Sequence, residues 1–177
     1  MKRLEAKSKK EILKERAQAL AREPKREEVE ERIEVVEFLL AYERYAIESR
    51  YVREVYPVKE IAPVPCTPPF VLGIINVRGQ ILSVIDIKKF FDLPERGLTD
   101  LNKVIILRDE EMEFGILADA ILGVHSIPTY EIQPSLPTLT GIREDYLKGV
   151  TGERAVILDA KKLLSDKKIV VHEEVET

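Results

Sequence analysis

The chain of 177 residues is 45% hydrophobic and 34% charged, with a net charge of −4 and one cysteine. Its length and apolar content suit one globular domain, or two small ones with a shared core, and exclude a chain that is disordered throughout. One cysteine excludes an internal disulfide, and the two histidines lie too far apart to indicate a metal site. We therefore expect a protein of a reducing compartment without a metal or other cofactor.

The first 32 residues differ in charge from the rest of the chain. They hold eleven Lys and Arg against eight Glu, a net +3, whereas the remaining residues are net −7. An acidic body repels a nucleic-acid backbone, and the mixed signs of the first segment favour a solvated helix face. Nucleic acid is therefore not an expected partner.

Within this N-terminal extension the sequence predicts a helix over residues 4–23. Its good helix formers surround a thin apolar stripe of Leu13, Ala17, Leu20 and Ala21. Pro24 ends that helix, and a second, almost wholly charged helical stretch is expected at residues 25–32. The extension is expected to dock weakly, on a second copy or on the body, or to stay solvated.

No stretch of the chain is long enough to cross a bilayer. The longest apolar run, residues 70–77, is interrupted by Gly73 and Asn76, and a crossing needs about 20 residues. The N-terminus has basic residues but no apolar segment typical of a secretory signal. We expect a cytoplasmic protein without direct membrane insertion.

From residue 33 the pattern becomes that of strands. Runs of β-branched and aromatic residues predict three hairpins, with strands at 34–41 and 45–48, 104–107 and 114–118, and 146–151 and 154–158. The first hairpin should turn at residues 42–44, and the third at Gly152 and Glu153. Five prolines between residues 57 and 69 predict an edge strand or an extended connection, and a second proline group predicts a polar link around residues 128–137.

An internal sequence repeat, which we call the echo, predicts a body of two similar parts. The run GQILSVIDIKKFF, Gly79–Phe91, aligns without a gap with GERAVILDAKKLL, Gly152–Leu164. In each run a turn glycine precedes a buried strand, an aspartate that caps a helix, and one amphipathic helical turn. Two small barrels, each closed by a short helix, would give this pattern, so we expect an extension (1–32), a body (33–165) and a tail (166–177).

Catalytic candidates are few. Asp86 and Asp159 occupy equivalent positions in the echo and would form an acid pair if both lined a shared cleft, but helix capping explains both without a partner His, Ser or Lys. Cys66 has no nearby histidine, and His125 lies on an apolar strand, so a buried or idle thiol and an ordinary histidine are expected. No phosphate-binding or hydrolase motif is present.

Arg78 lies between two β-branched runs, in GIINVRGQILSVID. Alternation places Ile75 and Val77 on one face and Arg78 on the other, beside Gly79, at the tip of a predicted hairpin. It is either a solubilising turn residue or a forked donor for a partner's carboxylate or carbonyl groups. Spacing alone leaves both possibilities open.

Three segments resemble the CheW family of chemotaxis coupling proteins. FVLGIINVRGQILSVIDIKKFF resembles the family signature, FGILADAILGV its later element, and YAIESRYVREVYPVKEIAPVP its upstream segment. The resemblance runs from Val35 to Leu164, with small departures at Val77, Ser83 and Ala118 and a longer N-terminal extension. None of the departures breaks a turn or reverses a face.

The resemblance implies a mostly β fold of two SH3-like five-stranded barrels without enzymatic activity. It implies a cytoplasmic adaptor of two-component signal transduction, which links chemoreceptor hairpin tips to the regulatory domain of the histidine kinase CheA in membrane receptor arrays. By position, the partner contacts are Val52, Glu54, Gly73 and Arg78, whereas Ile121 and Val124 line an inter-barrel groove for a receptor helix. An enzyme, or a module that scaffolds another assembly, remains an alternative.

Overall fold

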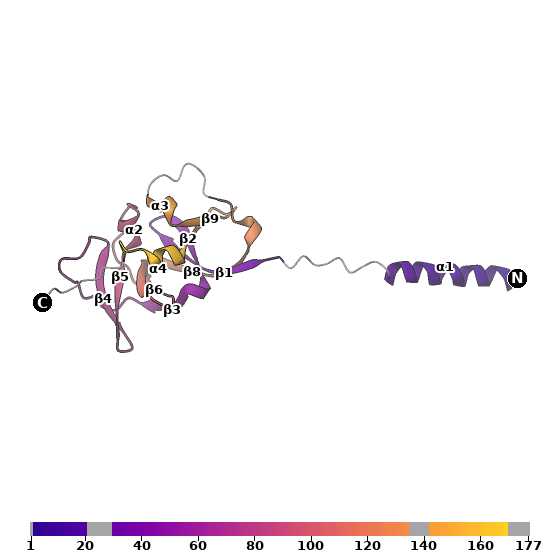
Figure 1. Cartoon of the computed structure of the whole chain (residues 1–177), viewed down its shortest axis with the longest axis horizontal. Coiled ribbons are helices and arrows are strands. Elements are labelled where there is room, and N and C mark those ends of the chain that lie inside the picture. The colour runs from indigo at the N-terminus through magenta and orange to yellow at the C-terminus, as the bar shows by residue number, and fades with distance from the viewer. Residues whose placement is uncertain (1, 21–29, 135–141, 170–177) are drawn as a thin grey trace. The chain divides into compact units, whose positions relative to one another are not determined.

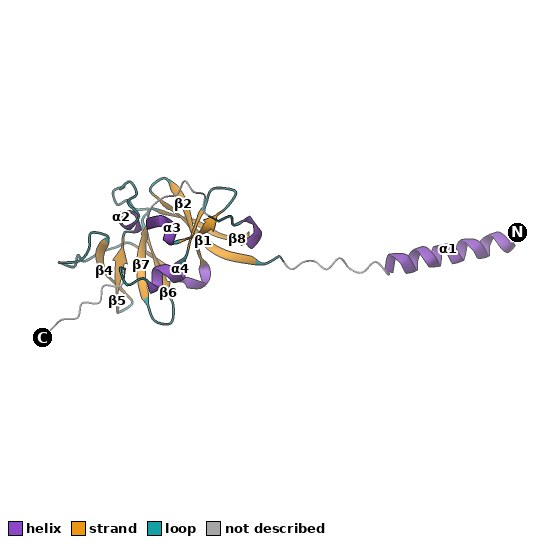
Figure 2. Cartoon of the chain, turned by 45° about the horizontal axis from the view of Figure 1, so that its top comes forward, coloured by secondary structure: helices purple, strands orange, loops and turns teal. Residues whose placement is uncertain are grey.

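The computed structural model describes residues 2–20, 30–134 and 142–169. The chain divides into two compact units, Met1–Glu31 and Arg32–Thr177. The described part of the first unit contains the helix α1 (Lys2–Leu20). The second unit is built mainly of strands, with short helices between them (Figure 2).

The helix predicted at residues 4–23 is present as α1, which begins at Lys2 and ends at Leu20. Ile12 and Leu13 are 46% and 64% exposed. The second predicted helical stretch is wrong where it is described, because Glu30 and Glu31 are not helical and Arg32 begins the first strand, where it pairs with Pro128. Ala21 and residues 25–29 lie outside the described residues.

The described residues of the second unit form ten strands and several short helices. The strands are β1 (Arg32–Leu40), β2 (Glu43–Glu48), β3 (Val52–Pro57), β4 (Val71–Val77), β5 (Gln80–Ile85), β6 (Lys103–Arg108), β7 (Glu113–Ala118), β8 (Ala120–Pro128), β9 (Leu147–Val150) and β10 (Val156–Leu158). The α-helices are α2 (Ile87–Phe90), α3 (Ile142–Asp145) and α4 (Ala160–Ser165), and the 3-10 turns are η1 (Ser49–Tyr51) and η2 (Thr129–Glu131). All three predicted hairpins are confirmed, although the first turns at Ala41 and Tyr42, with Arg44 already in β2.

The strands form two five-stranded sheets of the same topology. The β1 sheet has the order β8-β1-β2-β10-β9, and the β3 sheet has the order β3-β6-β7-β5-β4. Each contains one parallel pair at the same place, β2 with β10 and β7 with β5. The echo therefore reflects two copies of one architecture, in which the first hairpin of this unit completes the sheet made by its last strands (Figure 1).

Each sheet curls until its two edges come together. The chain that follows β3 pairs with β4 through Ala62 and Ile74, and the chain that follows β8 pairs with β9 through Gln133 and Val150. In both cases the chain leaving one edge strand joins the opposite edge, which turns an open sheet into a small barrel. The predicted fold of two five-stranded barrels is confirmed.

Both faces of the central strands are buried. In β6, Val104 and Ile106 pack inside the β3 barrel, whereas Ile105 and Leu107 join a core that both sheets share. In the β1 sheet Val35 packs inside the barrel, with Ile33, Ala46 and Ile157, and Phe38 faces the shared core. These strands therefore read as continuous apolar runs, because alternate side chains serve two different cores.

Both aspartates of the echo cap short helices. The Asp86 carboxylate accepts a hydrogen bond from the Lys88 amide (3.0 Å), and Asp159 accepts one from the Lys162 amide (3.1 Å). The capping prediction is confirmed. The expectation that Asp86 has no lysine partner is wrong, since the Lys88 Nζ lies 3.9 Å from its carboxylate.

The remaining expectations concern the connections and the end of the chain. Cys66 lies in the proline-rich connection after β3 and is exposed, so it is not a buried thiol. At the other end Ile169 is buried in the shared core, and the Tyr146 hydroxyl donates to Asp166. Residues 135–141 and 170–177, which include Pro137 and His172, lie outside the described residues.

Candidate functional site

The hairpin of β4 and β5 carries Arg78 at its tip. Val77 pairs with Gln80, so Arg78 and Gly79 are the two central residues of the turn. Both have positive φ, 52° and 88°, as a type I′ turn requires. The Asn76 side chain fixes this turn, because its Oδ1 accepts a hydrogen bond from the Gly79 amide (2.8 Å).

Arg78 is displayed but already has a partner. Its side chain is 75% exposed, and its Nη2 donates to the Glu54 Oε2 at 3.1 Å. Glu54 lies on β3, the strand at the opposite edge of the sheet from β4. The curl of the barrel thus brings together two residues that the resemblance assigns to partner contacts.

Three further polar side chains join this pair at the mouth of the β3 barrel. Arg53 Nη1 donates to the Gln80 Oε1 (2.8 Å) and to Glu113, and the Gln80 Nε2 donates to the Glu113 Oε2 (2.8 Å). The five residues Arg53, Glu54, Arg78, Gln80 and Glu113 form what we call the mouth network. They come from β3, β5, β7 and the hairpin turn, so the network ties separate strands of one barrel together.

Glu113 is the anionic centre of the mouth network. Burial acts to raise the pKa of its carboxyl, but the hydrogen bonds from Arg53 and Gln80 outweigh burial and hold the pKa below its ordinary value. The same hydrogen bond raises the pKa of the Arg53 guanidinium. The Arg53–Glu113 pair is therefore charged on both sides at neutral pH.

Replacing Glu113 by glutamine is expected to change how stability depends on pH. A carboxyl whose pKa is lowered on folding stabilises the folded state above its unfolded pKa, and this contribution is lost as the pH falls through the folded pKa. The Glu113→Gln variant should therefore be less stable than the parent at pH 7, and the difference should be smaller near pH 3. Urea unfolding at both pH values measures this, and an equal difference at both would contradict it.

Gly73 has a structural task close to the predicted site. It is buried, has a φ of 146°, and lies next to Ile74, which forms the two hydrogen bonds with Ala62 that close the barrel. A Cβ at residue 73 would lie 2.2 Å from the Ala62 carbonyl oxygen. The position therefore admits only glycine, and a buried Gly73 reaches a partner only through the shape that it gives the barrel.

Val52 begins β3 and is half-buried against the shared core. It also lines a cavity of about 450 Å³ together with Arg50, Tyr51, Arg53, Arg108, Asp109 and Glu110. The cavity shares Arg53 with the mouth network. Val52, Glu54 and Arg78 therefore belong to one continuous region of the β3 barrel.

Ile121 and Val124 are brought to one face of β8 by an irregularity in its pairing. Phe38 pairs with Ile121 and Glu37 with Gly123, so Leu122 is the extra residue of a bulge. Ile121 is partly buried against the shared core, whereas Val124 is 60% exposed. Both residues lie on the β1 barrel, so they form a second candidate region, separate from the mouth network on the β3 barrel.

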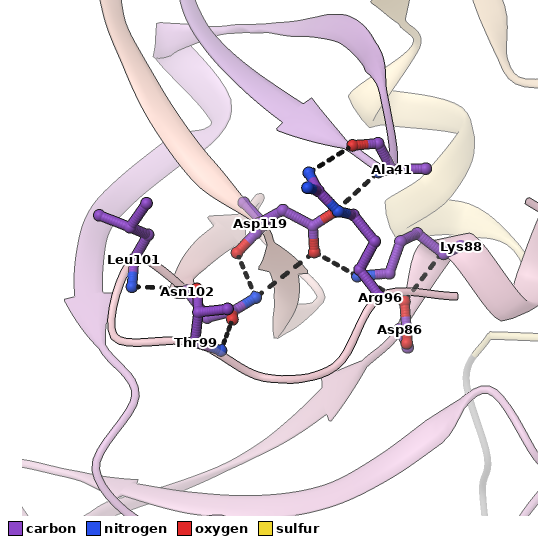
Figure 3. Close-up of polar contacts among 9 residues, drawn as sticks. Ala41, Asp86, Lys88, Arg96, Thr99, Leu101, Asn102 and Asp119 are labelled. Carbon is purple, nitrogen blue, oxygen red and sulfur yellow. Dashed lines mark hydrogen bonds and ion pairs between the residues drawn. The ribbon is translucent and has the colours of Figure 1, made fainter. Parts of the chain in front are cut away.

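A buried polar cluster joins the two sheets. Asp119 stands where the chain passes from β7 in one sheet to β8 in the other. Its carboxylate accepts hydrogen bonds from the Lys88 ammonium and, at 2.7 Å, from the Ala41 amide, and Asn102 lies within reach at 3.4 Å (Figure 3). Lys88 and Asp119 are 1% and 8% exposed, so this ion pair links α2 to the turn of the first hairpin inside the protein.

The acidic pair considered for catalysis serves the fold instead. Asp86 is buried and caps α2, and burial raises the pKa of its carboxyl against the lowering effect of Lys88. Asp159 caps α4 in the same way. Since both carboxylates are occupied as caps, they do not form an acid pair across a cleft.

The described residues include no group of three or more His, Cys, Asp or Glu side chains placed to hold a metal ion. None of their helices is both long and apolar enough to span a membrane. His125 lies on β8 and is half-exposed, with its Nε2 3.2 Å from Glu37.

Sequence reasoning identified Arg78 and Glu54 but missed Arg53, Gln80 and Glu113 of the mouth network. Gln80 and Glu113 each stand at the start of a strand whose alternate residues, Leu82 and Leu117 among them, pack inside the barrel. A polar residue at the first position of a strand whose alternate side chains face the barrel interior was the available sequence signal for such a network. Which polar residues meet depends on the curl of the sheet, which the local pattern does not specify.

Comparison with known proteins gives one consistent result. The family model of the CheW-like domain matches residues 34–168. The chain is 33% identical to a chemotaxis protein CheW of Treponema pallidum over 79% of this chain and 86% of that one, and 30% identical to a CheW of Klebsiella aerogenes over 78% and 85%. The crystal structure of the scaffolding protein TtCheW from Thermoanaerobacter tengcongensis matches with a TM-score of 0.69 and 31% identity, over 78% of this chain and 96% of that one.

Proposed function

Because the chain belongs to the CheW-like domain family, we propose that it joins the cytoplasmic hairpin tips of chemoreceptors to the regulatory domain of the histidine kinase CheA. The chain is a chemotaxis coupling adaptor and not an enzyme, as its family and its relatives indicate. The two named partners, and a place in the cytoplasm beside membrane receptor arrays, are the proposed part. Binding to them would require a surface that is formed before the partner arrives.

The observation that carries the proposal is the exposed and oriented guanidinium of Arg78. The turn that holds it is fixed by positive φ at two residues and by the hydrogen bond from Gly79 to Asn76. A preorganised arginine offers several directed donors at little cost in conformational entropy. Its fork suits the carboxylates or free carbonyl groups of a partner protein.

Ile121 and Val124 are proposed as the apolar half of the interaction. An amphipathic helix laid on an apolar face gains most of its affinity from a few buried anchors. The bulge of β8 supports this role because it presents Val124, which is largely exposed, on the same face as Ile121. The family position of these residues supports a receptor helix as the partner of this face.

Replacing Arg78 by glutamate is expected to weaken binding of at least one partner by about 2 kcal/mol, or roughly thirtyfold, if the guanidinium is an interface hot spot. The free energy of unfolding should change by no more than about 1 kcal/mol, because the pair with Glu54 is solvent-exposed. Titration of the full chain against a CheA regulatory domain and a receptor-tip fragment, followed by calorimetry, gives the affinities. Thermal unfolding of the same samples checks the fold.

The matched control is Arg154→Glu. Arg154 is also an exposed arginine with positive φ, in the turn between β9 and β10 of the other barrel. This variant should bind as the parent does. If the parent binds neither fragment, the proposed partners are wrong; if Arg78→Glu binds both fragments normally, Arg78 has no part in binding.

A further inference from the structure

Glu54 lies between two guanidinium groups rather than one. Arg78 donates to its Oε2 at 3.1 Å, and the Arg53 Nε lies 3.6 Å from its Oε1. The Glu54 side chain is only 19% exposed, whereas that of Arg78 is 75% exposed. One carboxylate of limited solvent access thus lies between an exposed cation, Arg78, and a second cation on its own strand, Arg53.

Arg53 is held in place without help from Arg78. Its Nη1 donates to both Gln80 and Glu113, and these two side chains are bonded to each other. Glu113 is 14% exposed, and the hydrogen bond from Arg53 helps to keep the carboxyl ionised. Arg53 therefore stays beside Glu54 wherever the Arg78 side chain points.

This arrangement matters when Arg78 leaves Glu54. An ion pair with an exposed partner contributes only about 0 to 1 kcal/mol to stability. Separating it therefore costs little free energy, as long as neither charge is left both unpaired and poorly solvated. If no other donor remained, a carboxylate with limited access to water would be left unpaired. Its full desolvation penalty would then oppose the separation of the ion pair. Arg53 supplies the remaining donor.

We infer that Arg53 is a positioning residue that frees Arg78 for a partner by holding the charge of Glu54. The inference rests on the proposed function, since it assumes that Arg78 contacts a partner protein. Arg78 then turns from Glu54 to a carboxylate or carbonyl group of the partner, while Glu54 stays paired with Arg53. Without Arg53, Glu54 competes with the partner for Arg78.

Replacing Arg53 by methionine tests the inference, because methionine keeps the length of the side chain and removes its charge. Affinity for the fragment whose binding Arg78→Glu weakens is expected to fall by about fivefold, a change of roughly 1 kcal/mol. In a Glu54→Gln background the same Arg53→Met substitution should have almost no effect on affinity, because a neutral glutamine does not retain Arg78. The readout is therefore the ratio of the two effects, measured by calorimetry on full-length chains.

Arg154→Met is the matched control. Arg154 is an exposed arginine in the turn between β9 and β10 of the other barrel, away from the mouth network. This variant should bind as the parent does in both backgrounds. Thermal unfolding of every variant separates a loss of affinity from a loss of folded protein.

The outcomes separate the inference from the proposed function. If the parent binds neither fragment, the proposed partners fail and the inference fails with them. If the parent binds and Arg78→Glu weakens binding, but Arg53→Met has no effect or an equal effect in both backgrounds, only the inference is overturned. An equal effect would mean that Arg53 merely supports the barrel mouth.

Discussion

Replacing Lys88 by methionine is expected to lower the free energy of unfolding by about 3 to 5 kcal/mol, the usual cost of removing one partner of a buried ion pair. Methionine fills the space of the lysine stem, so the cost comes from the unpaired charge of Asp119. That carboxylate would keep its hydrogen bond from Ala41 but lose its only ammonium partner among the described contacts. Urea unfolding at pH 7 measures the change.

The echo provides the matched control for this substitution. Lys161 occupies the position in α4 that Lys88 occupies in α2, but it is exposed. Lys161→Met should therefore leave the free energy of unfolding within about 0.5 kcal/mol of the parent. Equal effects of the two substitutions would show that the Lys88 pair contributes no more than a surface lysine does.

Replacing Gly73 by alanine is expected to destabilise the protein by at least about 3 kcal/mol, from backbone strain and a steric clash together. Alanine disfavours the positive φ of this residue, and its Cβ would lie 2.2 Å from the Ala62 carbonyl oxygen. The atom in the way belongs to the backbone, so the barrel closure itself must shift. Thermal and urea unfolding give the change.

Gly97→Ala is the control for Gly73→Ala. Gly97 is exposed, and a Cβ there would meet nothing within 4 Å, so the change in stability should be within about 0.5 kcal/mol. Partner binding should be measured at a temperature where the Gly73→Ala variant is folded. Loss of affinity without loss of stability would contradict the structural role and make Gly73 a direct contact.

Local pattern was sufficient to predict most elements of the fold. The hairpins are recognisable because β-branched runs flank short turns, and the caps at Asp86 and Asp159 because each aspartate stands between a strand and an amphipathic turn. The two-barrel fold followed from the echo and the family resemblance. These features depend on neighbours in sequence, which is why a single chain reveals them.

The parts that sequence reasoning missed depend on neighbours in space. Lys88 and Lys161 are equivalent in the echo, yet one is buried in an ion pair and the other is exposed, because only the first helix packs beside Asp119. Arg78 was recognised as displayed, but its pairing with Glu54 requires the opposite edges of a curled sheet to meet. Neither contact can be predicted from the local sequence pattern.

The first hairpin, β1 and β2, belongs to the same sheet as the last three described strands, so its sheet is completed late in biosynthesis. All strands of the β3 sheet lie between Val52 and Ala118, so this sheet can assemble while the ribosome is still adding the rest of the chain. β1 and β2 emerge earlier but must wait for β10, which ends at Leu158, before their sheet is complete. At about 5 to 20 residues per second, the side chains of the nascent hairpin that later pack against Ile157 inside the β1 barrel stay uncovered for several seconds.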